Sequence, residues 1–196
     1  MQTEHDVLSC APRRILVAGT SGSGKTTLAR RIAAMAGVPH TEIDALFHGP
    51  GWMPRESFMG EVTALAAQPG WVTEWQYGVA RPLLLQRADL LVWLDLPLSV
   101  VMQRVVRRTV VRRLGRTVLW NGNQEPPLRT FFTDPDHIVR WAWRTRHATA
   151  RRVAGAVTSR PDLTVVRLTS QPAVDGWLAG PLLDSCQPDT IAGPPG

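Results

Sequence analysis

The sequence predicts an α/β fold in which five parallel strands form one sheet that helices cover on both faces. Short, unbroken apolar runs such as Leu90–Leu94 are typical of parallel strands that are buried on both sides. They alternate with segments such as Lys25–Ala36, whose apolar residues recur at helical spacing. Strands that alternate with helices imply right-handed crossovers. The length of 196 residues favours one domain, which we place at residues 1–186.

The predicted sheet begins with the run Arg14–Ala18. A glycine-rich turn leads from it into the helix Lys25–Ala36, which Gly37 closes because glycine readily adopts the left-handed conformation at a helix C-terminus. The next segment, His40–Ile43, is predicted to be the second strand and to end at Asp44. Asp44 would then lie at the carboxyl edge of the sheet, where parallel α/β folds bind their ligands.

A third strand is predicted at Trp71–Glu74. It follows a helix that opens after Pro54, and a Pro-Gly turn separates the two elements. Glu74 ends this strand at the same edge as Asp44. The apolar face of the preceding helix comprises Phe58, Val62 and Leu65.

The rest of the chain supplies two more strands. The fourth, Leu90–Leu94, follows a short helix that starts at Pro82, and the next helix covers residues 97–114. Asp134 is predicted to cap a later helix, and Leu163–Leu168 is the predicted fifth strand.

Composition argues against a secreted or membrane protein. The first residues are polar and acidic, and no apolar run approaches the roughly 20 residues of a membrane helix. The two cysteines show no metal-ligand spacing. We therefore expect a cytoplasmic protein without a membrane partner, whose Pro- and Gly-rich residues 187–196 form a disordered tail.

The charge of the chain suits an anionic partner. The formal net charge is +6, and arginine provides all of the 22 basic residues except Lys25. Positive charge alone does not distinguish a nucleotide from a phosphorylated metabolite or a nucleic acid. A single lysine among arginines indicates that this position requires something that arginine lacks.

Residues 19–26 form a phosphate-binding motif. They read Gly-Thr-Ser-Gly-Ser-Gly-Lys-Thr and match G-x-x-x-x-G-K-[ST] at every specified position, between a predicted strand and a predicted helix. Glycines allow backbone N–H groups to approach phosphate oxygens, and the helix N-terminus adds partial positive charge. The motif makes the predicted fold a three-layer sandwich of the P-loop NTPase type.

The side chains of this motif predict how ATP and Mg²⁺ would be bound. Lys25 is predicted to reach the β- and γ-phosphates as a compact point charge, which the broad guanidinium of arginine cannot do. Thr26 is predicted to place its hydroxyl on Mg²⁺, and Thr27 to assist at the α-phosphate. The predicted nucleotide-binding residues of the loop are Gly22, Ser23, Gly24, Lys25, Thr26 and Thr27.

Two other classes of P-loop protein fit the sequence poorly. A GTPase needs a guanine-specifying N-K-x-D element, and the chain has no second lysine with which to make one. Large motors and helicases carry an acidic pair after an apolar strand, whereas Asp95 is followed by Leu96-Pro97. Asp95 is instead predicted to satisfy N–H groups at a helix entrance.

The chain resembles the adenylate-kinase-like family of P-loop small-molecule kinases over about residues 13–180. Within that family it is most similar to the bacterial group labelled "topology modulation protein". The chain has Glu74-Trp75-Gln76-Tyr77 where that group has Asp-Gly-Asn-Tyr, so tryptophan replaces glycine beside the expected acceptor. The resemblance rests on the order of the P-loop, Ile43–Leu46, Gly51-Trp52, Arg87–Asp89, Trp93–Pro97, an arginine-rich helix and Leu119–Asn123.

The resemblance implies a phosphotransferase that moves the γ-phosphoryl group of Mg·ATP to a small hydroxylated or phosphorylated acceptor. Asp44 is the candidate for positioning the acceptor and for general base, since phosphoryl transfer needs only an oriented hydroxyl and a group that takes its proton. Glu74 is the candidate for holding a Mg²⁺-bound water or contacting the acceptor. Either carboxylate would also serve as a strand-ending cap or a salt-bridge partner.

An arginine-rich helix is the candidate lid over the triphosphate. Arg104, Arg108 and Arg112 recur at positions i, i+4 and i+8 and can share one helix face. A lid over about residues 104–133 would exclude water from the transferred group. The alternative is a solvated basic face.

Two further residues are predicted to bind the acceptor. Arg81 precedes a predicted helix near the place where related kinases hold the acceptor, and it is expected to clamp an acidic group. Trp52 is expected to stack on a planar ring.

A second interpretation is an ATP-binding regulator associated with nucleic acid. The basic helix and Arg140–Arg152 would then contact nucleic-acid phosphates, and binding would weaken steeply with salt. The sequence contains no recognised nucleic-acid-reading motif, and the P-loop already accounts for part of the positive charge. The kinase interpretation is therefore favoured.

Overall fold

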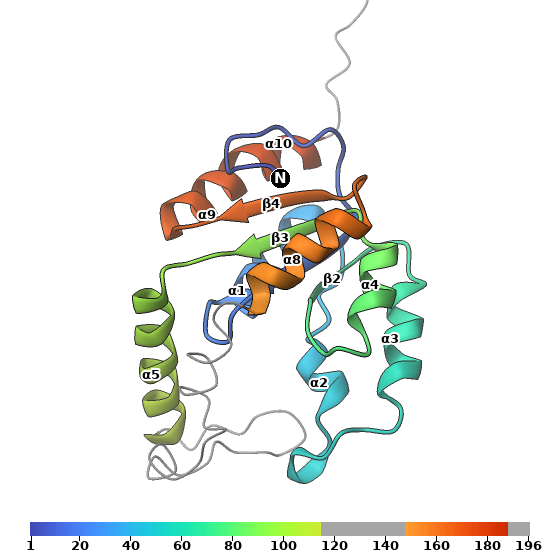
Figure 1. Cartoon of the computed structure of the whole chain (residues 1–196), viewed down its shortest axis with the longest axis vertical. Helices are drawn as coiled ribbons and strands as arrows, with labels where there is room; N and C mark the ends of the chain where they lie inside the picture. Colours follow the sequence, from blue (N-terminus) through green and yellow to red (C-terminus); the bar gives the residue numbers. More distant parts are fainter. Residues whose placement is uncertain (115–147, 188–196) are drawn as a thin grey trace, which may run out of the picture.

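A computed structural model describes residues 1–114 and 148–187. Within these residues, four strands form one parallel sheet in the order β2-β1-β3-β4. The strand that precedes the P-loop, β1, therefore lies at the centre, between β2 and β3 (Figure 1). The strands are β1 (Arg14–Gly19), β2 (Trp71–Glu74), β3 (Leu90–Leu94) and β4 (Thr164–Leu168).

Helices alternate with these strands, as predicted. In the part of the chain that the structure describes, no helix is both long and apolar enough to cross a membrane. The helices are α1 (Lys25–Ala36), α2 (Ile43–Phe47), η1 (Pro50–Trp52), α3 (Phe58–Ala66), α4 (Arg81–Arg87), α5 (Leu98–Leu114), α8 (Ala148–Ser159), α9 (Gln171–Trp177), η3 (Leu178–Leu182) and α10 (Leu183–Cys186).

The central strand supplies core residues to both faces of the sheet. Ile15 and Val17 belong to one buried apolar cluster, and Leu16 and Ala18 belong to a second. Neighbouring strand residues point to opposite faces, so a continuous apolar run buries both sides. The two clusters therefore mark a three-layer arrangement with the sheet in the middle.

The two faces are covered by different helices. The cluster of Ile15 and Val17 includes residues of α1, α9 and η3, whereas the cluster of Leu16 and Ala18 includes residues of α3, α4 and α8. In Figure 1, α8 crosses in front of the sheet and α1 lies behind it. The apolar helix face predicted from Phe58, Val62 and Leu65 is buried as expected.

The predicted second strand is wrong, and the sheet formed by residues 1–114 and 148–187 has four strands rather than five. His40 makes only an isolated parallel bridge to Val72. The backbone N–H of Ile43 then donates to the carboxylate of Glu74 at 3.1 Å instead of continuing along β2. The chain turns there into α2, and Asp44 consequently lies in the first turn of a helix and not at a strand end.

The other strand predictions agree with the structure to within one residue. Helix α5 runs to Leu114, as the apolar pattern predicts, and α8 follows at Ala148. Three predictions fall wholly or partly outside the described residues: the helix after Asp134, the part of the lid beyond residue 114, and the tail from residue 188 onward.

Candidate nucleotide and acceptor site

The P-loop forms the tight turn that its sequence predicts. β1 ends at Gly19 and α1 begins at Lys25, so residues 20–24 make the turn. Gly22 and Gly24 adopt left-handed φ angles of 80° and 99°, which residues with a Cβ rarely adopt. The conformation of the turn therefore favours glycine at both positions.

Packing against helix α5 also requires glycine at position 22. A Cβ added to Gly22 would lie 2.0 Å from Cγ2 of Val105. Val105 is itself fully buried and has no room to retreat. The phosphate-binding loop thus rests directly on the helix that carries the candidate lid arginines.

Lys25 concentrates positive charge at the loop. It is buried, with 8% of its surface exposed, and its Nζ donates to the carbonyl oxygen of Thr20 at 3.1 Å. The first turn of α1 contains no acidic residue that would offset the positive end of the helix dipole. The ammonium and the helix end together favour an anion.

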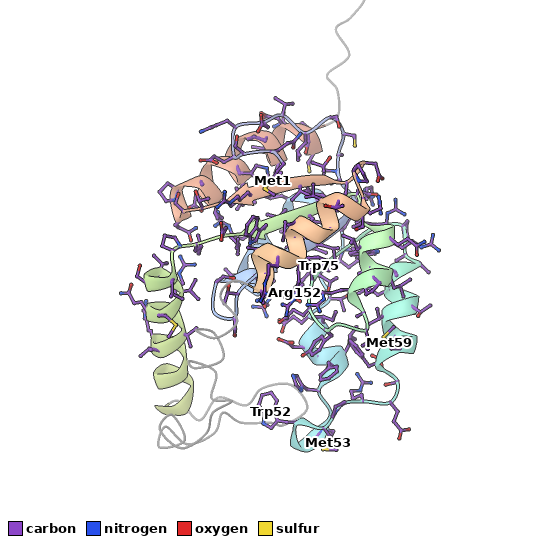
Figure 2. The ribbon with its side chains drawn as sticks, viewed as in Figure 1. Met1, Trp52, Met53, Met59, Trp75 and Arg152 are labelled. Atoms are coloured by element: carbon purple, nitrogen blue, oxygen red, sulfur yellow. The ribbon has the colours of Figure 1, made fainter. Side chains whose placement is uncertain are left out.

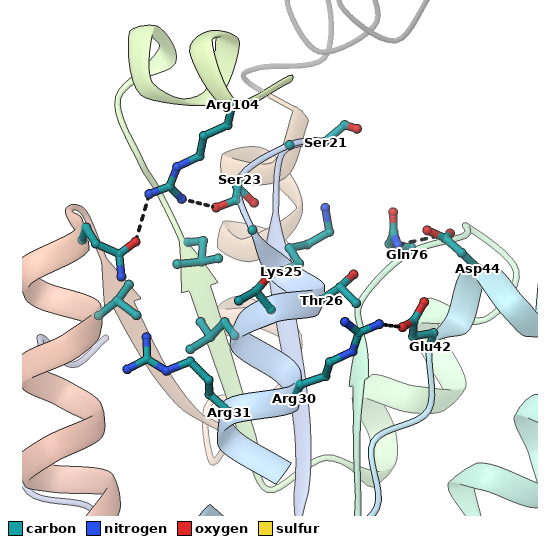
Figure 3. A pocket seen from close by; sticks show the side chains of 17 residues that line it. Ser21, Ser23, Lys25, Thr26, Arg30, Arg31, Glu42, Asp44, Gln76 and Arg104 are labelled. Carbon is teal, nitrogen blue, oxygen red and sulfur yellow. Dashed lines mark hydrogen bonds and ion pairs between the residues drawn. The ribbon is translucent and has the colours of Figure 1, made fainter. Parts of the chain in front are cut away.

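A cavity of about 480 Å³ opens beside the loop. This volume lies in the range of small-molecule sites. Figure 3 shows Lys25 and Thr26 on the P-loop side of the cavity, and Asp44 and Gln76 across from them. The lining residues are Ser21, Gly22, Ser23, Gly24, Lys25, Thr26, Thr27, Leu28, Arg30, Arg31, Glu42, Asp44, Gln76, Leu94, Arg104, Gln171 and Val174.

Arg104 connects the candidate lid helix to the cavity. Its Nη1 donates to the carbonyl oxygen of Ser23, and its Nη2 donates to Oε1 of Gln171, both at 2.9 Å. Both acceptors are uncharged, and no carboxylate among the described residues pairs with this guanidinium. Arg104 therefore keeps its full charge available to an anion in the cavity.

The other two arginines of the cavity wall are neutralised by carboxylates. Arg30 forms an ion pair with Glu42. Arg31 forms one with Asp175 at 2.8 Å. Among the arginines that the structure shows in the cavity lining, Arg104 is thus the one that pairs with no carboxylate of the described residues.

Asp44 reaches the cavity from α2 although no strand ends there. Its Oδ1 accepts hydrogen bonds from the Tyr77 hydroxyl at 2.6 Å and from the Gln76 side-chain amide at 3.3 Å. Asp44 thus lines the same cavity as the P-loop, but it does so from the first turn of a helix and not from the predicted strand end.

Glu74 lies beneath Thr26 and does not line the cavity. Its carboxylate is buried and contacts His40 Nε2 at 3.2 Å and the Ile43 N–H at 3.1 Å, in addition to the Thr26 side chain. Burial acts to raise the pKa of Glu74, but the hydrogen bonds from His40 and Ile43 outweigh it and hold the pKa below its ordinary value. A direct contact of Glu74 with the acceptor is therefore not part of the observed arrangement.

Arg81 and Trp52 lie outside the lining of the cavity. Arg81 begins α4, and burial followed by the positive charge of Arg152 on α8 lowers its pKa. Trp52 is partly exposed and contacts the edge of His48, with ring centroids 5.1 Å apart. In Figure 2, Trp52 and Met53 lie at the end of the molecule beyond α2.

The remaining predicted residues are only partly described. Arg108 and Arg112 lie within α5, but the structure does not describe their side chains. Within the ranges 1–114 and 148–187, no cluster of three or more His, Cys, Asp or Glu side chains is arranged to hold a metal ion.

The cavity lining also includes Arg30, Arg31, Glu42 and Gln76, for which the sequence predicted no role. Arg30 and Arg31 follow the P-loop by one helical turn, and this spacing is a signal that the sequence did contain. Glu42 and Gln76 enter the wall only because the chain turns at Ile43 and after Glu74, and a local pattern does not reveal those turns.

Among known proteins, this chain is similar in fold to several solved structures. No protein-family model and no curated protein matches the chain. The chain is similar to shikimate kinase from Acinetobacter baumannii, solved in complex with shikimate, with 20% identity over 85% of this chain and 89% of that one and a TM-score of 0.49.

Two further solved structures are similar. A gluconokinase from Sinorhizobium meliloti is 22% identical over 87% of this chain and 92% of its own, with a TM-score of 0.47. A sugar kinase from a Janibacter species is 20% identical over 87% of this chain and 97% of its own, with a TM-score of 0.46. At such identities a likeness concerns the fold alone and assigns no substrate to this chain.

Proposed function

We propose that the chain is a cytoplasmic small-molecule kinase that transfers the γ-phosphoryl group of Mg·ATP to a hydroxyl of a small acceptor. One observation carries the proposal: Lys25 and Thr26 of the P-loop line the same cavity as the carboxylate of Asp44. A phosphate cradle and a proton-accepting carboxylate on one cavity are the two parts that such a transfer needs.

In the proposed transfer, the P-loop residues bind the phosphates and Asp44 accepts the proton. The backbone of Gly22, Ser23 and Gly24 and the ammonium of Lys25 hold the β- and γ-phosphates, and Thr27 assists at the α-phosphate. The acceptor oxygen bonds to the γ-phosphorus as the bond from that phosphorus to the β,γ-bridging oxygen breaks. The hydroxyl proton passes to Asp44, and ADP leaves.

The donor set at the start of α1 fits a magnesium ion that arrives with the nucleotide. Thr26 lines the cavity with a hydroxyl, and the buried carboxylate of Glu74 contacts that side chain from the other side. Thr26 would hold the ion, and Glu74 would orient Thr26 or a water of the ion. Bound Mg²⁺ neutralises charge that develops on the phosphate oxygens.

The arginines of α5 supply the charge that covers the triphosphate. Arg104 already reaches the P-loop, and its guanidinium has only neutral partners among the described residues. Arg108 and Arg112 follow at helical spacing and would extend the same cover. Closure of this lid would exclude water and favour phosphoryl transfer to the acceptor over hydrolysis of ATP.

The acceptor would enter on the Asp44 side of the cavity. We assign Arg81 to an acidic group on the acceptor, because its neighbour Arg152 adds to the positive charge there. Trp52 would contribute an aromatic surface at the outer end of α2. The acceptor class is thus a small hydroxylated molecule, with or without a phosphate or carboxylate.

A screen of acceptors with two variants tests the proposal. Purified protein is incubated with Mg·ATP and a pooled library of nucleosides, nucleotides, sugars and sugar acids, and masses are searched for the gain of one phosphate. The wild-type chain should give a phosphorylated product. Lys25→Ala should lose ATP turnover while retaining its fold, and Asp44→Asn should bind ATP but transfer slowly.

Asp162→Asn is the matched control for Asp44→Asn, because Asp162 is exposed, pairs with Arg160 and does not line the cavity. It should leave product formation unchanged. ATP binding without any product, together with salt-sensitive retention of DNA or RNA, would contradict the kinase and favour the nucleic-acid-associated regulator.

A further inference from the structure

Asp44 is the end of a chain of side-chain hydrogen bonds that leads away from the cavity. The Tyr77 hydroxyl lies 2.6 Å from Asp44 Oδ1 and 3.1 Å from His48 Nε2. Tyr77 and His48 do not line the cavity themselves. The candidate base is therefore held from behind by two residues that a ligand in the cavity would not touch.

The direction of these hydrogen bonds follows from the groups involved. An ionised carboxylate only accepts, so the single hydroxyl proton of Tyr77 is donated to Asp44. The oxygen of Tyr77 then accepts from His48, which requires that Nε2 of His48 carry a proton. His48 therefore donates to the Tyr77 oxygen, and the Tyr77 hydroxyl donates to Asp44.

Only one oxygen of Asp44 is used in this way. Oδ1 accepts from both Tyr77 and Gln76. Among the described residues, no donor contacts Oδ2 within hydrogen-bonding distance. Since Asp44 lines the cavity, Oδ2 is the oxygen left for a ligand hydroxyl.

The backbone and ring of Tyr77 are fixed independently of its hydroxyl. Tyr77 has a φ of 54°, a left-handed conformation that is uncommon for a residue with a side chain and that occurs often at functional sites. Its carbonyl oxygen accepts from the N–H groups of Ala80 and Arg81 at 3.1 and 3.0 Å. Its ring stacks on Phe47, with centroids 3.9 Å apart and planes at 18°.

His48 is held by aromatic rings as well. Phe47 and Trp52 contact its imidazole edge to face, with centroids 5.0 and 5.1 Å away. The hydrogen-bond chain therefore consists of side chains whose rings have little freedom to turn. A carboxylate anchored to such a chain keeps one orientation.

We propose that Tyr77 and His48 are positioning residues for Asp44, which fix its Oδ1 so that Oδ2 meets the acceptor hydroxyl in one orientation. This inference rests on the proposed phosphoryl transfer. In that step the acceptor proton moves to Oδ2, the acceptor oxygen bonds to the γ-phosphorus, and ADP is the leaving group. Tyr77 and His48 exchange no atoms with the substrates.

The first test examines the Tyr77–Asp44 hydrogen bond without any activity. Tyr77 is the only tyrosine of the chain, so 3-fluorotyrosine incorporation gives one ¹⁹F resonance that reports the surroundings of this phenol alone. The phenol donates to the Asp44 carboxylate at 2.6 Å, so loss of the carboxylate changes its surroundings. At neutral pH the resonance of Asp44→Asn should lie at a different chemical shift from that of the wild type. In Asp162→Asn it should keep the wild-type chemical shift.

The second test examines the positioning role in catalysis. Tyr77→Phe keeps the ring that stacks on Phe47 but removes the hydroxyl, so kcat for the acceptor found in the library should fall about tenfold while KM for ATP is unchanged. His48→Gln retains an N–H donor and should keep more of kcat than His48→Leu. An unchanged kcat in Tyr77→Phe overturns the proposal.

The two tests separate this inference from the proposed function. A wild-type chain that phosphorylates no acceptor contradicts the proposed function, and with it the positioning role of Tyr77 in that reaction. A chain that transfers phosphate, but whose ¹⁹F chemical shift is the same in Asp44→Asn and the wild type, remains a kinase and overturns only the positioning by Tyr77.

Discussion

Arg104 donates a hydrogen bond of 2.9 Å from Nη1 to the carbonyl oxygen of Ser23, which joins helix α5 to the middle of the P-loop. The same guanidinium donates to Gln171 at the start of α9. One side chain thus spans the phosphate-binding loop and a helix that lies 67 residues further along the chain. A cation held in this place is ready to act on a triphosphate.

Replacement of this arginine should therefore impair transfer more than folding. In Arg104→Ala, kcat for phosphoryl transfer should fall about 100-fold, as expected for loss of one group that stabilises transition-state charge. Steady-state kinetics with the acceptor identified in the library measures the change. Arg107→Ala removes an exposed arginine from the same helix and is the control. Equal losses in both variants would indicate a general charge effect and exclude a specific role for Arg104.

Gly22 should not tolerate a larger residue, for two structural reasons. In Gly22→Ala the new Cβ meets Val105 at 2.0 Å, and the backbone keeps a φ of 80° that alanine adopts poorly. We expect the free energy of unfolding to drop by about 1–3 kcal/mol and ATP affinity to fall. Denaturant unfolding and calorimetric titration with Mg·ATP measure both quantities.

Gly60 provides the matched control for this substitution. It lies within α3, and a Cβ at this position meets nothing within 4 Å. Gly60→Ala should raise the free energy of unfolding by about 0.4–1 kcal/mol because alanine is the better helix former. If both alanine variants proved equally stable, the close approach of the loop to α5 would be contradicted.

The buried carboxylate of Glu74 should make stability depend on pH. Its pKa in the folded chain lies below the ordinary value of 4.5, so its contribution is present above about pH 4.5 and is lost as the pH falls through the lower folded value. Glu74→Gln should lower the free energy of unfolding at pH 7 by about 1–3 kcal/mol, because the carboxylate contacts His40 with one oxygen and accepts from Ile43 with the other, and an amide has only one accepting oxygen.

The measurement for Glu74 is a series of denaturant unfolding curves from pH 7 down to about pH 2, which passes through the window below the ordinary pKa of 4.5. The difference between the wild type and Glu74→Gln should shrink as the pH falls, because protonated Glu74 loses the same interactions. A difference that stays constant over this range would show that Glu74 does not supply pH-dependent stability.

The lone lysine of the chain should not tolerate arginine. Lys25 is buried, and its Nζ donates to the carbonyl oxygen of Thr20 at 3.1 Å. Arginine is longer and ends in a broad planar fork, so it cannot place a compact positive charge at the same point. In Lys25→Arg, ATP turnover should fall at least about 100-fold although the charge is kept. Arg151→Lys, the reverse exchange at an exposed position of α8, is the control and should not change turnover. Full activity in Lys25→Arg would show that charge alone is needed there.

Much of the fold could be predicted from local patterns. The strands around Leu16, Val72 and Leu91 are short apolar runs between turn residues, and the motif at residues 19–26 determines its own conformation through glycine and lysine. The strand expected at His40–Ile43 failed for a reason that is not local. The N–H of Ile43 is bonded to the side chain of Glu74, which lies 31 residues away in the chain.

The candidate site was predictable only in part for the same reason. Lys25 and Thr26 were identified by a contiguous motif, and Asp44 by its position at the end of a predicted strand. The contacts that orient Asp44 come from Gln76 and Tyr77, which lie 32 and 33 residues further along the chain. Such contacts depend on how helices pack on the sheet, and no spacing in the sequence reports them.

The most direct test of the proposed function follows the phosphoryl group itself. ATP that carries ¹⁸O in the γ-phosphoryl group is incubated with the wild-type chain, Mg²⁺ and the acceptor library, and the products are analysed by mass spectrometry. The proposed function predicts an acceptor whose new phosphate carries the label, formed by the wild type and not by Lys25→Ala. Label that appears only in inorganic phosphate, or in products of both proteins alike, would contradict phosphoryl transfer by this site.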